Sequence, residues 1–233
     1  MAGTGEGRLE IGMTAHGFGR YIWALTLYCA GRQTYAPSVC EGIIRRNAES
    51  IHYPWRAHII GLVMTRFAST FEGRVAAERE KREAKAAGNP DWWTMGYKGG
   101  PLGADFDEDG WVQAATYLAK HDRCDPAVTN ACWDGDDPAV TVTFDDVDDL
   151  WFMVCCAIRH DLCGGDAQVM APAGHLAFVE AHADLLNAKW VTNMLRDLDD
   201  GFYASFGTDM GEWDGLRGAL EAWRAAHPDD FRR

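Results

Sequence analysis

The chain has 233 residues, of which 47% are hydrophobic and 24% charged, and its formal net charge is −13. This composition is ordinary for a globular protein, and 10 Trp and 10 Phe exclude disorder over most of the length. The longest apolar run, residues 150–158, is far shorter than the roughly twenty residues that a membrane-spanning helix needs. The start of the chain has no pattern of a signal peptide, so we expect a cytoplasmic protein with reduced cysteines.

The charges are divided unevenly along the chain. Residues 101–233 hold 26 acidic and 9 basic side chains, whereas residues 1–100 hold 9 acidic and 13 basic ones. Of the 26 acids 22 are Asp, which favours helix caps and turns. We therefore expect a basic helical part at 1–87, a linker rich in Gly and Trp at 88–110 and an acidic helical part at 111–233, as subdomains or as one continuous domain.

The spacing of apolar residues predicts a mainly α fold. Helices are expected at 14–31, 38–47, 54–87, 111–121, 173–188, 189–199 and 213–226. A further helix should begin after a cap at Asp145 or Asp146 and end near Leu162. Alternation at 140–144 is the one convincing strand signal. The expected fold is a compact multi-helix domain with at most one small β hairpin or sheet.

The segment Asp105-Phe-Asp107-Glu-Asp109-Gly110 matches the first half of a calcium loop, with oxygen ligands at positions 1, 3 and 5 and a glycine at position 6. Position 12 is Thr116, which cannot supply the bidentate carboxylate of such a loop. The alternative is an acidic turn before a helix, where negative charge is favourable.

A second possible metal site lies in the predicted helix that ends near residue 162. Cys156, His160 and Cys163 share one side of this segment, and thiolate and imidazole are the usual ligands of zinc. The alternative interpretation is that thiols on an apolar helix simply pack in the core. His58 falls on the apolar side of its own helix and is interpreted as a core histidine.

Two His-Asp dipeptides leave an enzymatic interpretation open. His121-Asp122 and His160-Asp161, together with Asp197, are residues that a metal-dependent phosphohydrolase or nucleotide-processing enzyme would use. The chain has neither a Gly-Lys-Ser/Thr phosphate loop nor a G-x-S-x-G motif. The absence of a complete catalytic motif favours a protein that is not an enzyme.

The segment Tyr28-Cys-Ala-Gly31-Arg32-Gln-Thr34-Tyr35 is followed by a predicted capped helix. It resembles the opening of small phage and prophage proteins with a Y-x-x-G-R-x-T-Y segment. The resemblance covers residues 15–70 and implies a phage-type origin. It carries no activity, cofactor or catalytic residue.

The leading hypothesis is a non-enzymatic acidic protein that engages a basic surface of a host protein, as an inhibitor or a nucleic-acid mimic. Its interaction residues would be Asp145, Asp146, Asp148, Asp149, Asp197, Asp199 and Asp200, together with Trp92, Trp93 and Tyr97 of the linker. Capping and solubility are the alternative roles of the Asp clusters. A virion or assembly component is the third class. Direct nucleic-acid binding is not expected, because the acidic part repels phosphate.

Overall fold

A computed structural model of the protein describes residues 8–32, 37–52, 55–63, 80, 82–90, 108–120, 126–164, 168–199 and 208–232. The strands are β1 (Leu9–Thr14) and β2 (Ala139–Phe144). The α-helices are α1 (Ala15–Arg32), α2 (Pro37–Arg46), α4 (Glu108–Lys120), α5 (Pro126–Trp133), α6 (Val147–Gly164), α7 (Pro172–Ala181), α8 (Ala188–Asp199) and α10 (Asp214–Ala226). Three 3-10 helices are η3 (Ala183–Leu185), η4 (Met210–Trp213) and η5 (Pro228–Phe231).

The protein is mainly α over these residues, which confirms the predicted fold class. Residues 55–63 are helical as well, inside the helix predicted at 54–87. None of the helices in the described ranges has the length and apolar character needed to cross a membrane.

The two strands form a small antiparallel sheet although they lie far apart in the sequence. Leu9 is opposite Phe144, and Thr14 is opposite Ala139. The alternation of the strands places Ile11 on the buried face and leaves Gly12 exposed, as a half-buried strand requires. The pairing joins the beginning of the chain to its middle, so the sheet is not a hairpin.

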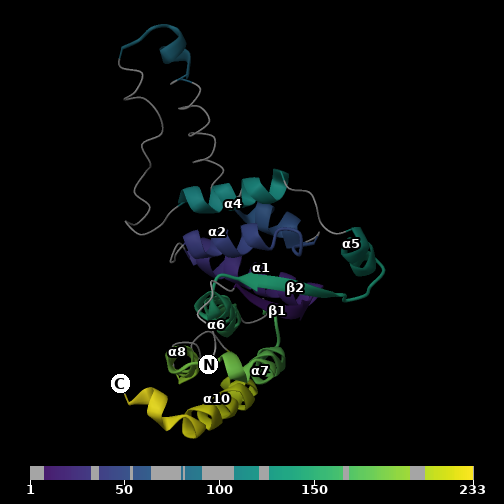
Figure 1. Ribbon diagram of the computed structural model, residues 1–233, viewed down its shortest axis with the longest axis vertical. Helices are drawn as coiled ribbons and strands as arrows, with labels where there is room; N and C mark the ends of the chain where they lie inside the picture. The colour runs from purple at the N-terminus through teal and green to yellow at the C-terminus, as the bar shows by residue number, and fades with distance from the viewer. Residues whose placement is uncertain are drawn as a thin grey trace.

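The core is one continuous cluster of apolar side chains. Helices α1 and α6 pack directly against each other, α2 packs on α4, and α10 contacts both α7 and α8. Figure 1 shows the sheet and α6 in the middle of the molecule, α2 and α4 above them, and α7, α8 and α10 below. Elements of the predicted basic and acidic parts therefore share one sheet and one core.

Several predicted boundaries differ from the structure. The predicted linker at 88–110 overlaps the start of α4, which begins at Glu108. The helix predicted at 173–188 is divided into α7 and η3. Asn187 caps the following α8 by accepting a hydrogen bond from the Trp190 amide at 3.2 Å. Asp146 caps α6 as predicted, with the Asp149 amide 3.0 Å from its Oδ1.

Candidate metal centre

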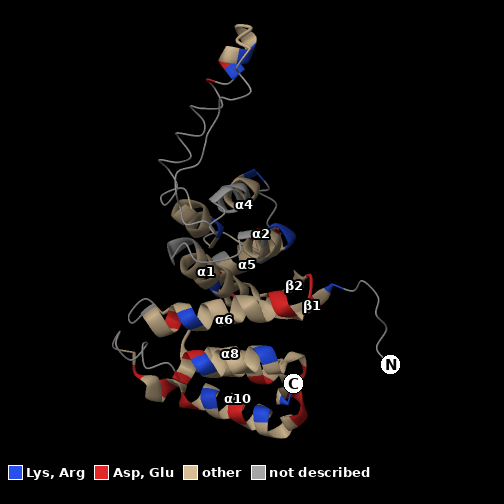
Figure 2. Ribbon diagram, turned by 90° about the vertical axis from the view of Figure 1, so that its left-hand side faces the viewer, with Lys and Arg blue, Asp and Glu red and all other residues tan. Residues whose placement is uncertain are grey.

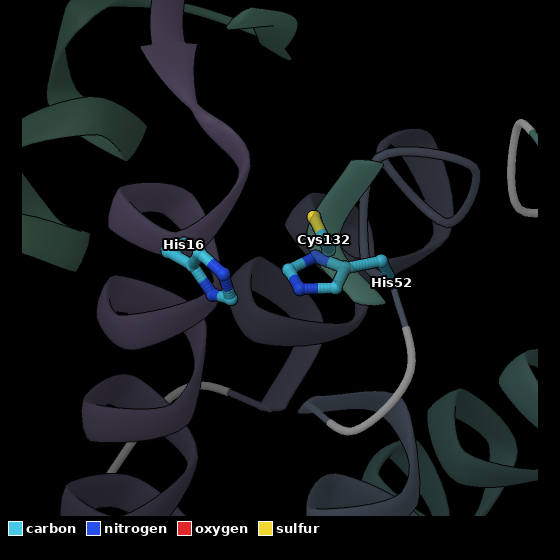
Figure 3. A group of neighbouring side chains, drawn as sticks. All are labelled: His16, His52 and Cys132. Carbon is cyan, nitrogen blue, oxygen red and sulfur yellow. The ribbon is translucent and has the colours of Figure 1, made fainter. Parts of the chain in front are cut away.

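Three metal-ligating side chains converge near the end of the sheet. His16 lies in the first turn of α1, His52 follows the turn after α2, and Cys132 lies near the end of α5. One ring nitrogen of each histidine and the thiol sulfur all lie within 4.8 Å of one another (Figure 3). Within the described residues, this is the one group of three or more His, Cys, Asp or Glu side chains that comes this close.

The first turn of α1 fixes the backbone of His16. Its amide donates a hydrogen bond to Asp137 Oδ1 at 2.8 Å. The neighbouring Ala15 amide donates to the Pro138 carbonyl at 2.8 Å, and the Gly17 amide donates to Thr14 Oγ1 at 3.1 Å. The first amides of a helix have no partner within the helix, so these contacts satisfy donors that α1 cannot. They also hold His16 against the segment that connects α5 to β2.

His52 is the most unusual member of the group. Its side chain is fully buried, and neither Nδ1 nor Nε2 has a hydrogen-bond partner. The ring of His16 meets it edge-on, with the ring centroids 5.0 Å apart and the planes at 77°. Burial lowers the pKa of His52 and the neighbouring His16 lowers it further, against the opposing effect of Asp137. These effects favour the neutral imidazole, which is the form that binds a metal.

Cys132 supplies a free thiol that is half-buried. Burial raises the pKa of this thiol, and the charges of Asp137 and Asp136 raise it further. The turn that follows α5 contains Gly135, which has a φ of 90°. In this turn the Asp136 amide donates a hydrogen bond to the Ala131 carbonyl at 2.9 Å. This turn keeps Asp136 and Asp137 beside the thiol. A metal ion at Cys132 would therefore face added negative charge.

The donor set of two imidazoles and one thiol fits a borderline or soft divalent metal. Zinc takes nitrogen and sulfur ligands at about 2.0–2.3 Å. The same donor types also suit copper. Three protein ligands leave one position of a tetrahedral ion open to solvent, because His16 and Cys132 are both only half-buried.

The structure does not bring together the three residues that the sequence suggested for zinc. Cys156 is buried in the core, with its Sγ 3.8 Å from the Sγ of Cys29, and burial raises its pKa well above the ordinary value. Cys163 is half-buried at the end of α6, and its sulfur does not form a close group with Cys156 and His160. This arrangement agrees with the packing alternative.

Other predicted site residues lie outside the described part of the chain. Asp109 lies in the first turn of α4, so the segment of the suspected calcium loop continues directly into a helix. The undescribed residues are Asp105, Asp107, Trp92, Trp93, Tyr97, His121, Asp122 and Asp200. Calcium binding and the aromatic interaction residues therefore stay predictions.

Two carboxylates of the proposed phosphohydrolase, Asp161 and Asp197, have partners within the chain. Asp161 is fully buried and contacts His175, and Asp197 is buried beside Arg159 with 2.6 Å between Oδ2 and Nε.

The expectation that His58 lies in the core is wrong. Its side chain is exposed, and its ring lies near the rings of Trp23 and Trp55.

Most of the described Asp residues in the predicted acidic clusters contact groups of the same chain. Asp145 pairs with Arg46, and Asp199 pairs with Arg217 at 3.1 Å. Asp148 accepts hydrogen bonds from Lys189 at 2.7 Å and from the Trp190 indole at 2.6 Å.

Asp149 differs from these carboxylates in its pKa. Burial raises this pKa, and the charges of Asp146 and Asp145 raise it further. Figure 2 shows basic segments between the acidic ones on α6, α8 and α10. Capping and internal pairing account for many of these carboxylates, and docking to a basic host protein stays a prediction.

Comparison with known proteins gives no relative: no protein family, curated protein or solved structure matches the chain. The resemblance to phage proteins therefore stays a prediction, and function has to be inferred from the site itself.

Proposed function

We propose that the protein binds a transition-metal ion, with zinc as the best fit, through His16, His52 and Cys132. The observation that carries the proposal is the burial of His52 with both ring nitrogens unpaired, directly beside an imidazole and a thiol. A buried polar atom without a partner costs about 1–3 kcal/mol. A metal ion bound to one ring nitrogen would remove part of this cost.

The positions of the ligands in the fold support the same proposal. They come from α1, from the turn after α2 and from α5, which are distant in the sequence. A metal ion that joins them would stabilise the folded state, because the unfolded chain has no preformed site. It would also tie α5 to the start of α1, beyond the hydrogen bonds that the Asp137 carboxylate and the Pro138 carbonyl accept.

Metal analysis of the purified protein and a cobalt titration test the proposal. We expect one equivalent of metal that a chelator removes, and a thiolate-to-cobalt charge-transfer band when Co²⁺ is added. Cys132→Ser should abolish the band and weaken binding by more than about 100-fold, because even outer contacts of a metal site cost 10–100-fold.

Two matched variants serve as controls. Cys163→Ser removes a half-buried thiol outside the group, and His58→Asn removes an exposed imidazole. Both should bind cobalt as the wild type does. Equal cobalt binding by the wild type and Cys132→Ser, or no binding by the wild type, would rule the proposal out.

A further inference from the structure

A groove whose lining includes none of the three proposed metal ligands lies between β1, the start of α1 and α7. Its volume is about 330 Å³, which is within the usual size range of small-molecule sites. Met13, Tyr21, Met170 and Phe178 form most of its apolar wall. Thr14, Arg20 and His182 are further polar side chains of the lining.

Small residues keep the groove open. Gly12 lies on the exposed side of β1, and a Cβ built there would meet no atom within 4 Å. Ala177 on α7 lines the opposite side and is exposed. Larger side chains at these two lining positions give a direct way to fill the groove.

The charge lining the groove is positive, in a protein whose net charge is −13. Arg20 is exposed and forms no ion pair with the described residues. No Asp or Glu of the described chain lines the groove. The charge of the Asp161 carboxylate raises the pKa of Tyr21. This carboxylate does not line the groove, because it is fully buried and contacts His175 at 2.9 Å.

One wall residue also carries a polar group without a partner. Tyr21 is 2% exposed, and its hydroxyl has no hydrogen-bond partner. Burial raises the pKa of Tyr21, and Asp161 raises it further, so the phenol is a neutral donor. The groove thus combines apolar walls, which include Tyr21, with one exposed guanidinium.

We infer that this groove binds a small monocarboxylate with an apolar body. The apolar part packs against Met13, Met170 and Phe178, and the carboxylate pairs with Arg20. Guanidinium binds carboxylate through charge-assisted hydrogen bonds, and the apolar walls favour a hydrocarbon chain or ring over a sugar or nucleotide.

Calorimetric titration with octanoate tests the inference, with octanol as the uncharged analogue. We expect saturable binding of octanoate, and binding of octanol that is at least about tenfold weaker. Arg20→Gln should weaken octanoate binding by about the same factor and leave octanol binding unchanged, because only the carboxylate uses the guanidinium.

Two filling variants come from opposite sides of the groove. Ala177→Trp and Gly12→Leu should each abolish octanoate binding, while Ala173→Trp, at an exposed position of the same helix outside the groove, should retain it. Circular dichroism identifies a variant that does not fold, and the other filling variant then decides the result. The inference is overturned if octanoate does not bind saturably, if octanol binds equally well, or if a folded filling variant still binds octanoate.

Discussion

His175 Nε2 lies 2.9 Å from Asp161 Oδ2, and both side chains are fully buried. The same carboxylate accepts hydrogen bonds from the amides of Val169 at 2.8 Å and Met170 at 3.1 Å. The ring of His175 in turn stacks on Trp213, with centroids 5.6 Å apart. Asp161 lies on α6, His175 on α7 and Trp213 in η4. The contacts of the pair therefore hold α7 and η4 against α6.

Asp161→Asn should lower the free energy of unfolding by about 1–3 kcal/mol, the usual cost of leaving a buried hydrogen-bonding group without its partner. The reason is geometric, because an amide has one acceptor oxygen and cannot replace two carboxylate oxygens that accept from three donors. Urea denaturation measures the change.

The matched control for this prediction is Asp199→Asn. This carboxylate is 62% exposed and pairs with Arg217. Exposed ion pairs contribute about 0–1 kcal/mol. A loss at Asp161 no larger than the loss at Asp199 would contradict the prediction.

The long helices could be predicted because their apolar residues repeat regularly. Phe18, Ile22 and Leu25 are fully buried on α1, as a helical stripe requires. The strand β1 was missed because Glu10 and Gly12 weaken its pattern, and its partner lies more than a hundred residues away. Helix α5 was missed as well, since its eight residues are too few for a clear period.

The metal group could not be predicted from spacing. Sequence motifs for zinc rely on ligands a few residues apart, whereas His16, His52 and Cys132 come from three separate segments. The β1–β2 pairing brings His16 near the segment that follows α5, and the bonds of Asn47 and Ser50 to β2 hold the turn that leads to His52. Nor could the sequence show which histidines are buried: His58 is expected in the core, whereas among the described histidines His52 and His175 are the buried ones.

The stability of the metal-free protein should fall as the pH is lowered from 7.5 to 5.5. His52 has a lowered pKa in the folded state, while a histidine in the unfolded chain takes up a proton near its ordinary pKa of about 6.5. The unfolded state then binds more protons, so stability that is present above this pKa is lost below it. One histidine contributes at most about 1.4 kcal/mol per pH unit.

Urea midpoints of the chelator-treated protein at several pH values measure this dependence. His52→Asn removes the titrating group and should give a shallower slope than the wild type. His58→Asn changes an exposed imidazole and should leave the slope unchanged. Identical slopes for the wild type and His52→Asn would exclude His52 as the source.

Asn47→Ala should destabilise the sheet, because the Asn47 amide acts as a partner for the free edge of β2. Its Nδ2 donates to the Thr143 carbonyl at 2.8 Å, and its Oδ1 accepts from the Thr143 amide at 2.8 Å. Leaving these backbone groups unpaired should cost about 1–3 kcal/mol of unfolding free energy. Ser50→Ala removes a more exposed bond to the Thr141 carbonyl at 3.2 Å and should cost less. Thermal denaturation of both variants measures the difference, and equal losses would contradict the assigned role.

Metal affinity, if Cys132 is a ligand, should rise with pH between about 7 and 8. Burial and the charges of Asp137 and Asp136 raise the pKa of this thiol, so it is protonated in the metal-free protein. Binding must release that proton, and the apparent Kd should fall about tenfold for each pH unit. His52 adds nothing to this slope, since its lowered pKa leaves it neutral already. Competition titrations of zinc against a chromophoric chelator, corrected for the chelator's own protonation, measure the slope. A Kd that does not change over this interval would show that the thiol does not bind the ion.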